Sequence, residues 1–179
     1  VNSNAAIAVS VQTSDYEPVD GSLALGAIAF QRRIESAAFR AGGDHYDVPV
    51  ETVGDFLAGD RPVHMPGRVQ PGYRGGEHFR LARMGDVLPD FACRNLARGL
   101  RAFDRKRPGY AMPEAILSAA ETRTSAPVRI LRGEDFCAIG QPGLYPCGEG
   151  AGYAGGITSA AVDGIRVAEA ICARYAPVH

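Results

Sequence analysis

The stretch GLYPCGEGAGYAGGITSAAVDGIRVAEAI, residues 143–171, decides how the end of the chain folds. Within it, Gly150, Gly152 and Gly155 form the string G-x-G-x-x-G, which is typical of a dinucleotide-binding turn. That fingerprint also needs a following strand with an acidic residue about 20 residues further on. The helix predicted after the glycines runs to about Arg174, so we expect neither that strand nor a first Rossmann turn here.

The glycines are denser than a simple turn requires. Positions 148, 150, 152, 155 and 156 are all glycine, although each glycine that is ordered on folding costs conformational entropy. Glycines let a backbone approach a ligand, and the first N–H groups of a helix are unpaired and carry the positive end of its dipole. The pattern favours a phosphate or ring-oxygen site at the helix start. The alternative is a turn whose glycines serve packing alone.

Three segments predict helices. The first begins after the capping residue Ser22 and ends at Gly42-Gly43. The second begins at about Pro89 and ends before Pro108-Gly109. We expect its apolar residues to face the core; they are Phe91, Leu96, Leu100 and Phe103. The third has one apolar face, formed by Ile157, Ala161, Ile165, Ala168 and Cys172.

The remaining segments predict strands and a long loop. The apolar runs AAIAVSVQ (5–12), PVRIL (127–131) and GLYPCGEG (143–150) each predict a strand. Residues 49–76 are rich in glycine and proline and predict a loop with a short element at about 50–57. A loop of this length usually serves or covers a site.

Composition limits the class of protein. The chain has 179 residues, 46% of them hydrophobic and 22% charged, and these are globular values. A net charge of −1 gives no general attraction to nucleic acid or to acidic membranes. No apolar run approaches the roughly 20 residues that span a bilayer, and the four cysteines have neither metal nor disulfide spacing. We therefore expect a reduced, cytoplasmic protein, and its start at Val1 suggests a piece of a longer chain.

Other candidate chemistry is weaker. The histidines at 45, 64, 78 and 179 have no metal-ligand spacing, so no metal site is predicted. His64, in the proline-rich loop, is the acid/base candidate among them. A stripe of arginines at 94, 98, 101 and 105 could bind an anion, although a solvated helix face explains it as well. Cys147, just before the glycine turn, predicts packing rather than redox chemistry.

The chain resembles a family over most of its length. Residues 143–171 are similar to the C-terminal end of bacterial, uncharacterised FAD-dependent dehydrogenases of the NAD(P)/FAD-dependent oxidoreductase type. The segments ETRTSAPVRILR (121–132) and FDRKRPGYAM (103–112) resemble the same family, and residues 30–59 look like the segment that precedes them.

The resemblance implies an α+β fold in which substrate or cap-region segments (1–140) are followed by the closing strand, glycine turn and helix of an FAD-binding domain (141–179). It also implies a set of cofactor-binding residues: Gly148, Glu149, Gly150, Ala151, Gly152, Tyr153, Gly155, Gly156 and Ile157. Glu149 would lie on the ribityl side, and the backbone at 155–157 would face the pyrimidine end of the flavin. Many relatives have Asp where Glu149 stands.

The resemblance further places Arg123, Thr124 and Ser125 beside the flavin or substrate, where Arg123 could clamp a substrate carboxylate. A turn whose hydroxyls bond to the local backbone is the alternative. The implied partners are the N-terminal Rossmann half of the same protein, a small-molecule substrate and, as an option, NAD(P)H. Without that half, we expect this chain to lack FAD and activity. The competing hypothesis is a non-catalytic interaction or anion-binding module.

Overall fold

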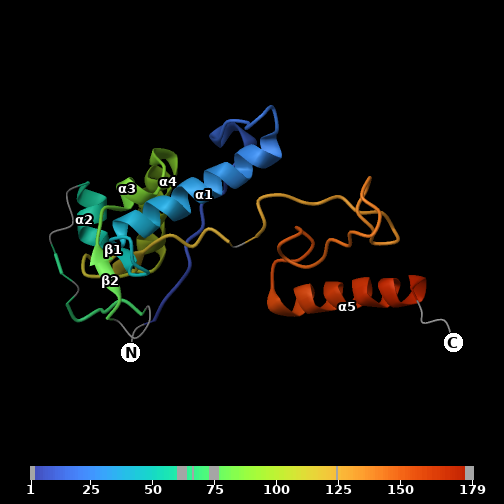
Figure 1. Cartoon of the computed structure of the whole chain (residues 1–179). Coiled ribbons are helices and arrows are strands. Elements are labelled where there is room, and N and C mark those ends of the chain that lie inside the picture. The colour runs from blue at the N-terminus through green and yellow to red at the C-terminus, as the bar shows by residue number, and fades with distance from the viewer. Residues whose placement is uncertain (1–2, 60–63, 66, 73–76, 124, 176–179) are drawn as a thin grey trace. The chain divides into compact units, whose positions relative to one another are not determined.

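The computed structural model describes residues 3–59, 64–65, 67–72, 77–123 and 125–175. The chain forms two compact units, whose segments can be followed by colour in Figure 1. Unit 1 comprises Val1–Asp15 and Phe30–Ala120, and unit 2 comprises Tyr16–Ala29 and Glu121–His179.

A small mixed sheet organises unit 1. Its central strand β1 (Val48–Thr52) pairs in parallel with β2 (Phe79–Leu81) and antiparallel with β3 (Ile116–Ser118), so the order is β2-β1-β3. Val50 stands opposite both Leu81 and Ser118 and is fully buried. A strand that is paired on both edges places consecutive residues in the interior, and four of the five residues of β1 are buried.

Three helices lie wholly within unit 1, and two of them contact the central strand. They are α2 (Val53–Ala58), α3 (Met84–Val87) and α4 (Asp90–Lys106), and a 3-10 turn, η1, spans Thr13–Asp15. Met84, Val53 and Leu100 fill the core with Val50. The buried Glu51 accepts a hydrogen bond from the Met84 backbone N–H through Oε2, at 2.8 Å. A side chain of β1 thereby satisfies the first free donor of α3, which has no side-chain cap of its own.

The helix α1 (Leu23–Ala41) contributes residues to both units. Ser22 Oγ accepts a hydrogen bond from Leu25 N at 3.3 Å, which confirms the predicted cap. The C-terminal end is followed by Gly43 at φ +83°, a left-handed conformation that stops a helix. Within unit 1, Phe30 of α1 stacks on Phe91 of α4 with ring centroids 6.3 Å apart.

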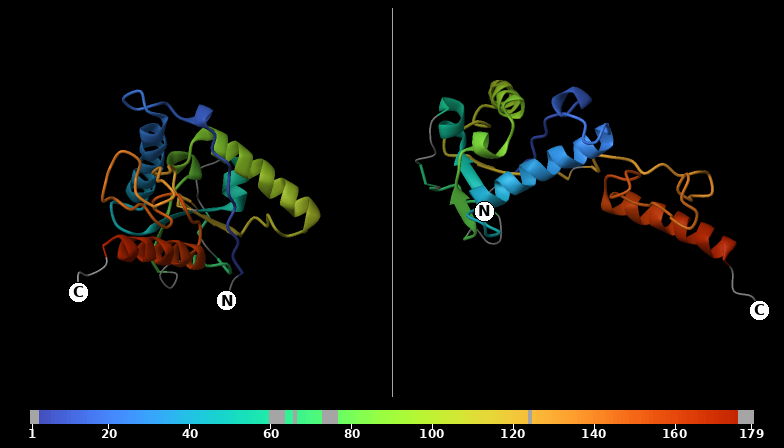
Figure 2. Two further views of the ribbon diagram at one scale, coloured as in Figure 1. Left: turned by 90° about the vertical axis from the view of Figure 1, so that its right-hand side faces the viewer. Right: turned by 45° about the horizontal axis from the view of Figure 1, so that its top comes forward.

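Unit 2 contains one long helix, α5 (Ile157–Arg174), and the loops that precede it. Figure 1 and both views of Figure 2 show the loops of residues 125–155 on one side of α5. Val167 of α5 and Ala151 of the preceding loop are buried, at 3% and 6% exposed. The face that sequence analysis identified as apolar lies exposed instead: Ile157 is 93% exposed and Ile165 is 59% exposed.

The coarse fold prediction is confirmed, since the described residues form a mixed fold of helices and a three-stranded sheet. Helices begin and end within a residue or two of the predicted positions in all three predicted cases. The element expected at 50–57 is also present, as the end of β1 followed by α2. The predicted domain division at residue 140 stays a prediction.

Three predicted strands are wrong. Residues 5–12 and 127–131 are irregular, and residues 143–150 combine turns at 143 and 148–150 with irregular backbone at 144–147. Residues 5–12 are apolar but mostly exposed, and no strand among the described residues pairs with them. The segment after Pro127 is bound instead through individual contacts with the glycine turn, such as Ile130 N to Ala151 O at 3.2 Å. Phe103, expected in the core, is 43% exposed and meets Tyr110 edge to face.

Within the described residues, we find no helix that combines the length and apolar character needed to cross a membrane.

Candidate functional site

The glycine-rich turn is held by its own backbone. Tyr153 N donates to Gly148 O at 3.0 Å, and Gly152 N donates to Glu149 O at 2.9 Å. Gly148 has φ +69°, a conformation that L side chains rarely adopt. The turn is therefore an ordered structure that leads directly into α5. Both the turn and the helix were predicted from the sequence.

Gly152 is required for a close approach between two loops. Its φ is +83°, and a Cβ atom there would lie 2.5 Å from Val128 O and 2.9 Å from the Arg129 Cα. No real Cβ atom tolerates such a distance. Only glycine therefore lets residues 128–129 pack against the turn. Gly150 differs, because a Cβ atom there would meet nothing within 4 Å.

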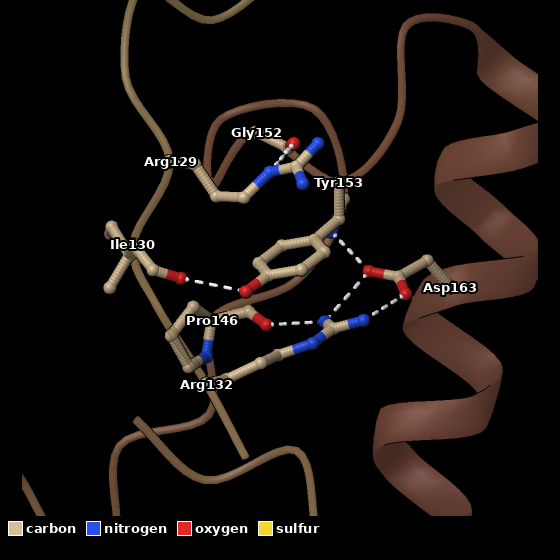
Figure 3. A network of polar contacts seen from close by, with 8 residues as sticks. Arg129, Ile130, Arg132, Pro146, Gly152, Tyr153 and Asp163 are labelled. Carbon is tan, nitrogen blue, oxygen red and sulfur yellow. Dashed lines mark hydrogen bonds and ion pairs between the residues drawn. The ribbon is translucent and has the colours of Figure 1, made fainter. Parts of the chain in front are cut away.

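An ion pair ties the turn to α5. Arg132 Nη2 lies 2.6 Å from Asp163 Oδ1, and Arg132 Nη1 lies 3.0 Å from Asp163 Oδ2, a bidentate arrangement (Figure 3). Gly148 N also donates to Asp163 Oδ2 at 2.8 Å, and Arg132 Nη1 reaches Pro146 O at 2.6 Å. The hydrogen bond from Arg132, followed by that from Gly148, lowers the pKa of Asp163 from 3.8 to about 2. The carboxylate is thus charged at neutral pH and occupied by the protein itself.

Tyr153 lies between two arginines. Its hydroxyl donates to Ile130 O at 3.0 Å, and the Cζ atom of Arg132 lies 3.6 Å from the centre of its ring. The Cζ atom of Arg129 lies 5.1 Å from the same ring, and Arg129 Nε donates to Gly152 O at 2.9 Å. Guanidinium groups are attracted to the face of an aromatic ring. Figure 3 shows these contacts together, and they fix the position of Tyr153 at the end of the turn.

No side chain of the described residues caps the N-terminus of α5. Gly156 is the N-cap residue, with φ −159° and ψ 162°, and it offers no side-chain acceptor to the first helical N–H groups. An open cavity of about 690 Å³ lies beside this end of the helix. Its lining is formed by Tyr153, Gly156, Ile157, Thr158, Ser159, Val162, Asp163 and Arg166. The unpaired donors and the positive end of the helix dipole can bind a ligand's polar edge there.

A second cavity of about 450 Å³ brings two predicted groups of residues together. It is lined by Ser125, Ala126, Pro127, Val128, Arg129, Gly152, Tyr153, Ala154 and Gly155. Ser125, predicted to be near the substrate, therefore lies in the same cavity as the predicted cofactor residues Gly152, Tyr153 and Gly155. Arg123 lines neither cavity, and its backbone N–H donates to Glu121 Oε1 at 3.3 Å. Thr124 lies outside the described residues.

The pair formed by Arg132 and Asp163 was not predicted from the sequence. Asp163 shares a side of α5 with Ala160 and Val167, which are three residues before it and four after it. A charged residue on a packed helix side is unfavourable unless it has a partner, so its position was a usable signal. Identifying Arg132 as that partner requires the fold, because the two residues are 31 positions apart.

The weaker candidates lie elsewhere. In unit 1, His64 Nδ1 lies 2.6 Å from Oδ1 of the buried Asp55, whose Oδ2 accepts His64 N at 3.2 Å. Of the arginine stripe on α4, Arg101 donates to Leu57 O at 3.2 Å. Cys147 is exposed, contrary to the expected packing role, and all four cysteines are free thiols. The residues that the structure describes contain no cluster of three or more potential metal ligands.

The fold and the turn together define a class: a mixed α/β protein whose glycine-rich turn leads into an uncapped helix start beside a cavity. The chain belongs to the family described as FAD-dependent protein, C-terminal domain-like, which it matches over residues 1–124. An uncharacterized protein of Clostridium beijerinckii is 48% identical to it over 174 residues, which cover 97% of this chain and 32% of that protein. The chain therefore spans about a third of that relative's length. The predicted link to FAD-dependent proteins is confirmed at this level.

Proposed function

We propose that the chain is the C-terminal part of an FAD-dependent oxidoreductase and supplies the flavin-ring end of the FAD site. The observation that carries the proposal is membership of an FAD-dependent C-terminal family. The geometry of unit 2 supports it, because the donors at the start of α5 face a cavity and lack a protein cap. These features suit the electron-rich pyrimidine edge of a flavin.

The backbone N–H groups of Gly155, Gly156 and Ile157 would hold that edge. Gly150 has open space where a side chain would stand, so a ligand can approach its backbone closely. Glu149 would bind on the ribityl side and Tyr153 would lie near the ring. Bound flavin supplies hydride transfer through its N5 atom. The positive end of α5 would then favour the negative charge of the reduced cofactor.

The other side of the pocket would be formed by residues after Glu121. Ser125 lies in one cavity with Gly152 and Gly155, which supports a place in the substrate wall. Arg123 and Thr124 would complete that wall. We propose a dehydrogenase acting on a small molecule, with NAD(P)H as an optional redox partner.

The exposed face of α5 supports a partner within the same protein. Its apolar residues Ile157, Val162 and Ile165 are 93%, 43% and 59% exposed. A matching relative extends well beyond the aligned region. We propose that this face packs against the Rossmann half that binds the adenosine and the diphosphate of FAD. The 179-residue chain alone would then be colourless.

One substitution tests the helix start directly. Ile157→Pro removes the N–H of the first helical residue, yet proline is well accepted there, and the extended Gly156 suits a following proline. Ile157→Ala is the matched control, because it also removes the exposed side chain but keeps the N–H. In the full-length protein, we expect Ile157→Pro to weaken flavin binding and to lower the flavin reduction potential. Ile157→Ala should weaken flavin binding only modestly and leave the reduction potential unchanged. The readouts are the visible flavin absorbance and a potentiometric titration.

A full-length protein that carries no flavin after gentle purification would overturn the proposal. So would equal flavin affinity and potential in the proline and alanine variants. Stoichiometric FAD in the 179-residue chain would contradict the need for the Rossmann half.

A further inference from the structure

Two arginines flank Tyr153, and only one of them has a carboxylate partner among the described residues. Arg132 is neutralised by Asp163. Arg129, on the other side of the ring, has a single polar contact with the residues that the structure describes, from Nε to Gly152 O at 2.9 Å. Figure 3 shows this bond as the one dashed line drawn to Arg129. Its two Nη groups keep their donors for another acceptor.

Contacts within unit 2 orient the exposed Arg129 side chain in the absence of a ligand. A hydrogen bond from Ile130 N to Ala151 O, at 3.2 Å, joins the backbone next to Arg129 to the glycine turn. The Nε bond and the Tyr153 ring, 5.1 Å from Cζ, then hold the guanidinium. An arginine held through Nε and by stacking loses little further freedom when its Nη groups bind a planar or tetrahedral oxyanion. Because Arg129 is exposed, a ligand can reach its Nη groups from solvent.

Arg129 also lines the cavity of about 450 Å³ that contains Ser125 and the backbone of Ala154 and Gly155. A hydroxyl and backbone N–H groups are the donors that accompany arginine in oxyanion sites. None of the residues that line this cavity is acidic. The lining of the cavity thus has the positively charged Arg129 side chain, a hydroxyl and backbone N–H groups as donors, and no carboxylate that would compete for them.

We propose that Arg129, with Ser125 and the backbone of Ala154, forms a binding site for an oxyanion group, a carboxylate or a phosphate. The site stands on contacts within unit 2 and does not depend on the proposed flavin chemistry. Two sources could supply the group: the substrate, or the diphosphate of NAD(P)H. The diphosphate of FAD is not one of them, since the proposed Rossmann half binds it.

The test is a titration of the isotope-labelled 179-residue chain, followed by NMR, with inorganic phosphate and separately with acetate. Sodium chloride keeps the ionic strength constant, because exposed cations also attract anions without a site. We expect saturable shifts of the Arg129 Nε–H signal and of the Ala154 amide signal. Arg129→Gln should weaken binding by at least about tenfold, and Arg129→Lys should retain part of it.

Arg98→Gln is the matched control, since it removes the same charge from an exposed arginine of α4 in unit 1. It should leave the affinity unchanged. Shifts that stay linear for both anions, or saturable binding that survives Arg129→Gln, would overturn the site. Amide spectra show whether each variant keeps the turn, and Arg129→Lys provides the comparison if Arg129→Gln disturbs it.

A titration of the full-length protein distinguishes the sources. If NADH or NADPH displaces phosphate from Arg129 in the FAD-loaded protein, the site belongs to the diphosphate of the nicotinamide cofactor, and if neither displaces it, the site serves the substrate. Either result keeps the site. A full-length protein that contains flavin but shows no phosphate binding with or without FAD would contradict this proposal and leave the proposed function standing.

Discussion

Arg132 and Asp163 form a bidentate ion pair whose side chains are only 9% and 14% exposed, and this pair joins the loop before the glycine turn to the second turn of α5. The same carboxylate accepts the Gly148 N–H. One side chain of the helix therefore fixes both the arginine under Tyr153 and the first residue of the turn. The turn is held in place by the protein before a ligand binds.

Asp163→Asn should destabilise the chain by about 3 kcal/mol, because it leaves a mostly buried guanidinium without its charge partner. The free energy of unfolding in urea, followed by circular dichroism, measures the loss. Glu114→Gln is the control, since Glu114 pairs with Arg68 at 3.4 Å and both side chains are exposed. Its effect should stay below about 1 kcal/mol. Equal effects of the two substitutions would show that the buried pair contributes no more than a surface contact.

Asp163 should also make the free energy of unfolding depend on pH in the acid range. Its pKa is lowered from 3.8 to about 2 in the folded chain, mainly by Arg132. The unfolded chain therefore binds this proton first as the pH falls, and the stabilisation that is present above pH 3.8 is lost on the way down to about pH 2. The difference in unfolding free energy between the native chain and Asp163→Asn should shrink through this window. A difference that stays constant across it would contradict the role of the ion pair.

The contribution of Glu51 to stability should depend on pH in the opposite direction to that of Asp163. Burial raises the pKa of the Glu51 carboxyl group above 4.5, so the fold favours the protonated form. Its contribution to stability is then fully present below the unfolded pKa and is lost as the pH rises through the folded pKa. Glu51→Gln keeps an acceptor for Met84 N without the charge. We expect this variant to be at least as stable as the native chain at neutral pH and to lose that advantage in acid. The reverse ranking at neutral pH would show that the carboxylate stabilises the fold.

The sequence predicts the helices because their signals are local. Ser22 caps α1, Pro89 precedes α4, and the apolar spacing of α5 is read from consecutive turns. The strands are different, since β2 and β3 have three residues each and gain their stability from pairing with β1. Three residues carry no usable periodicity. Residues 5–12 have strand-forming composition, but none of the described strands pairs with them.

Part of the candidate site was also predictable, because its signals are local in the sequence. The glycines and the helix after them are adjacent in sequence, so the turn at Gly148 and the helix start at Ile157 follow from pattern alone. Arg132 and Asp163 meet only because the loop folds back onto α5. The contact of Gly152 with Val128 is likewise set by the loop path and cannot be read from the glycine string.

Gly152 and Gly150 form a matched pair for testing the turn. Gly152→Ala combines positive φ with a Cβ atom 2.5 Å from Val128 O and should cost roughly 2 kcal/mol or more. Gly150→Ala meets nothing within 4 Å, so it should change the free energy of unfolding by less than about 1 kcal/mol. In the full-length protein, Gly150→Ala should instead lower the flavin content, since the proposed cofactor approaches that backbone. Similar stability losses in both variants would argue against the loop contact at Gly152.

The exposed face of α5 gives the last prediction. Ile165 is 59% exposed, whereas Val167, two residues on, is 3% exposed and packs beneath the loops. Val167→Ser should therefore destabilise the 179-residue chain by about 2 kcal/mol, and Ile165→Ser should leave it within about 0.5 kcal/mol. If the Rossmann half covers this face, Ile165→Ser should destabilise the full-length protein and reduce its flavin content. An Ile165→Ser protein that is unchanged at full length would show that the face stays in water, because burying a hydroxyl in place of the isoleucine side chain has a measurable cost.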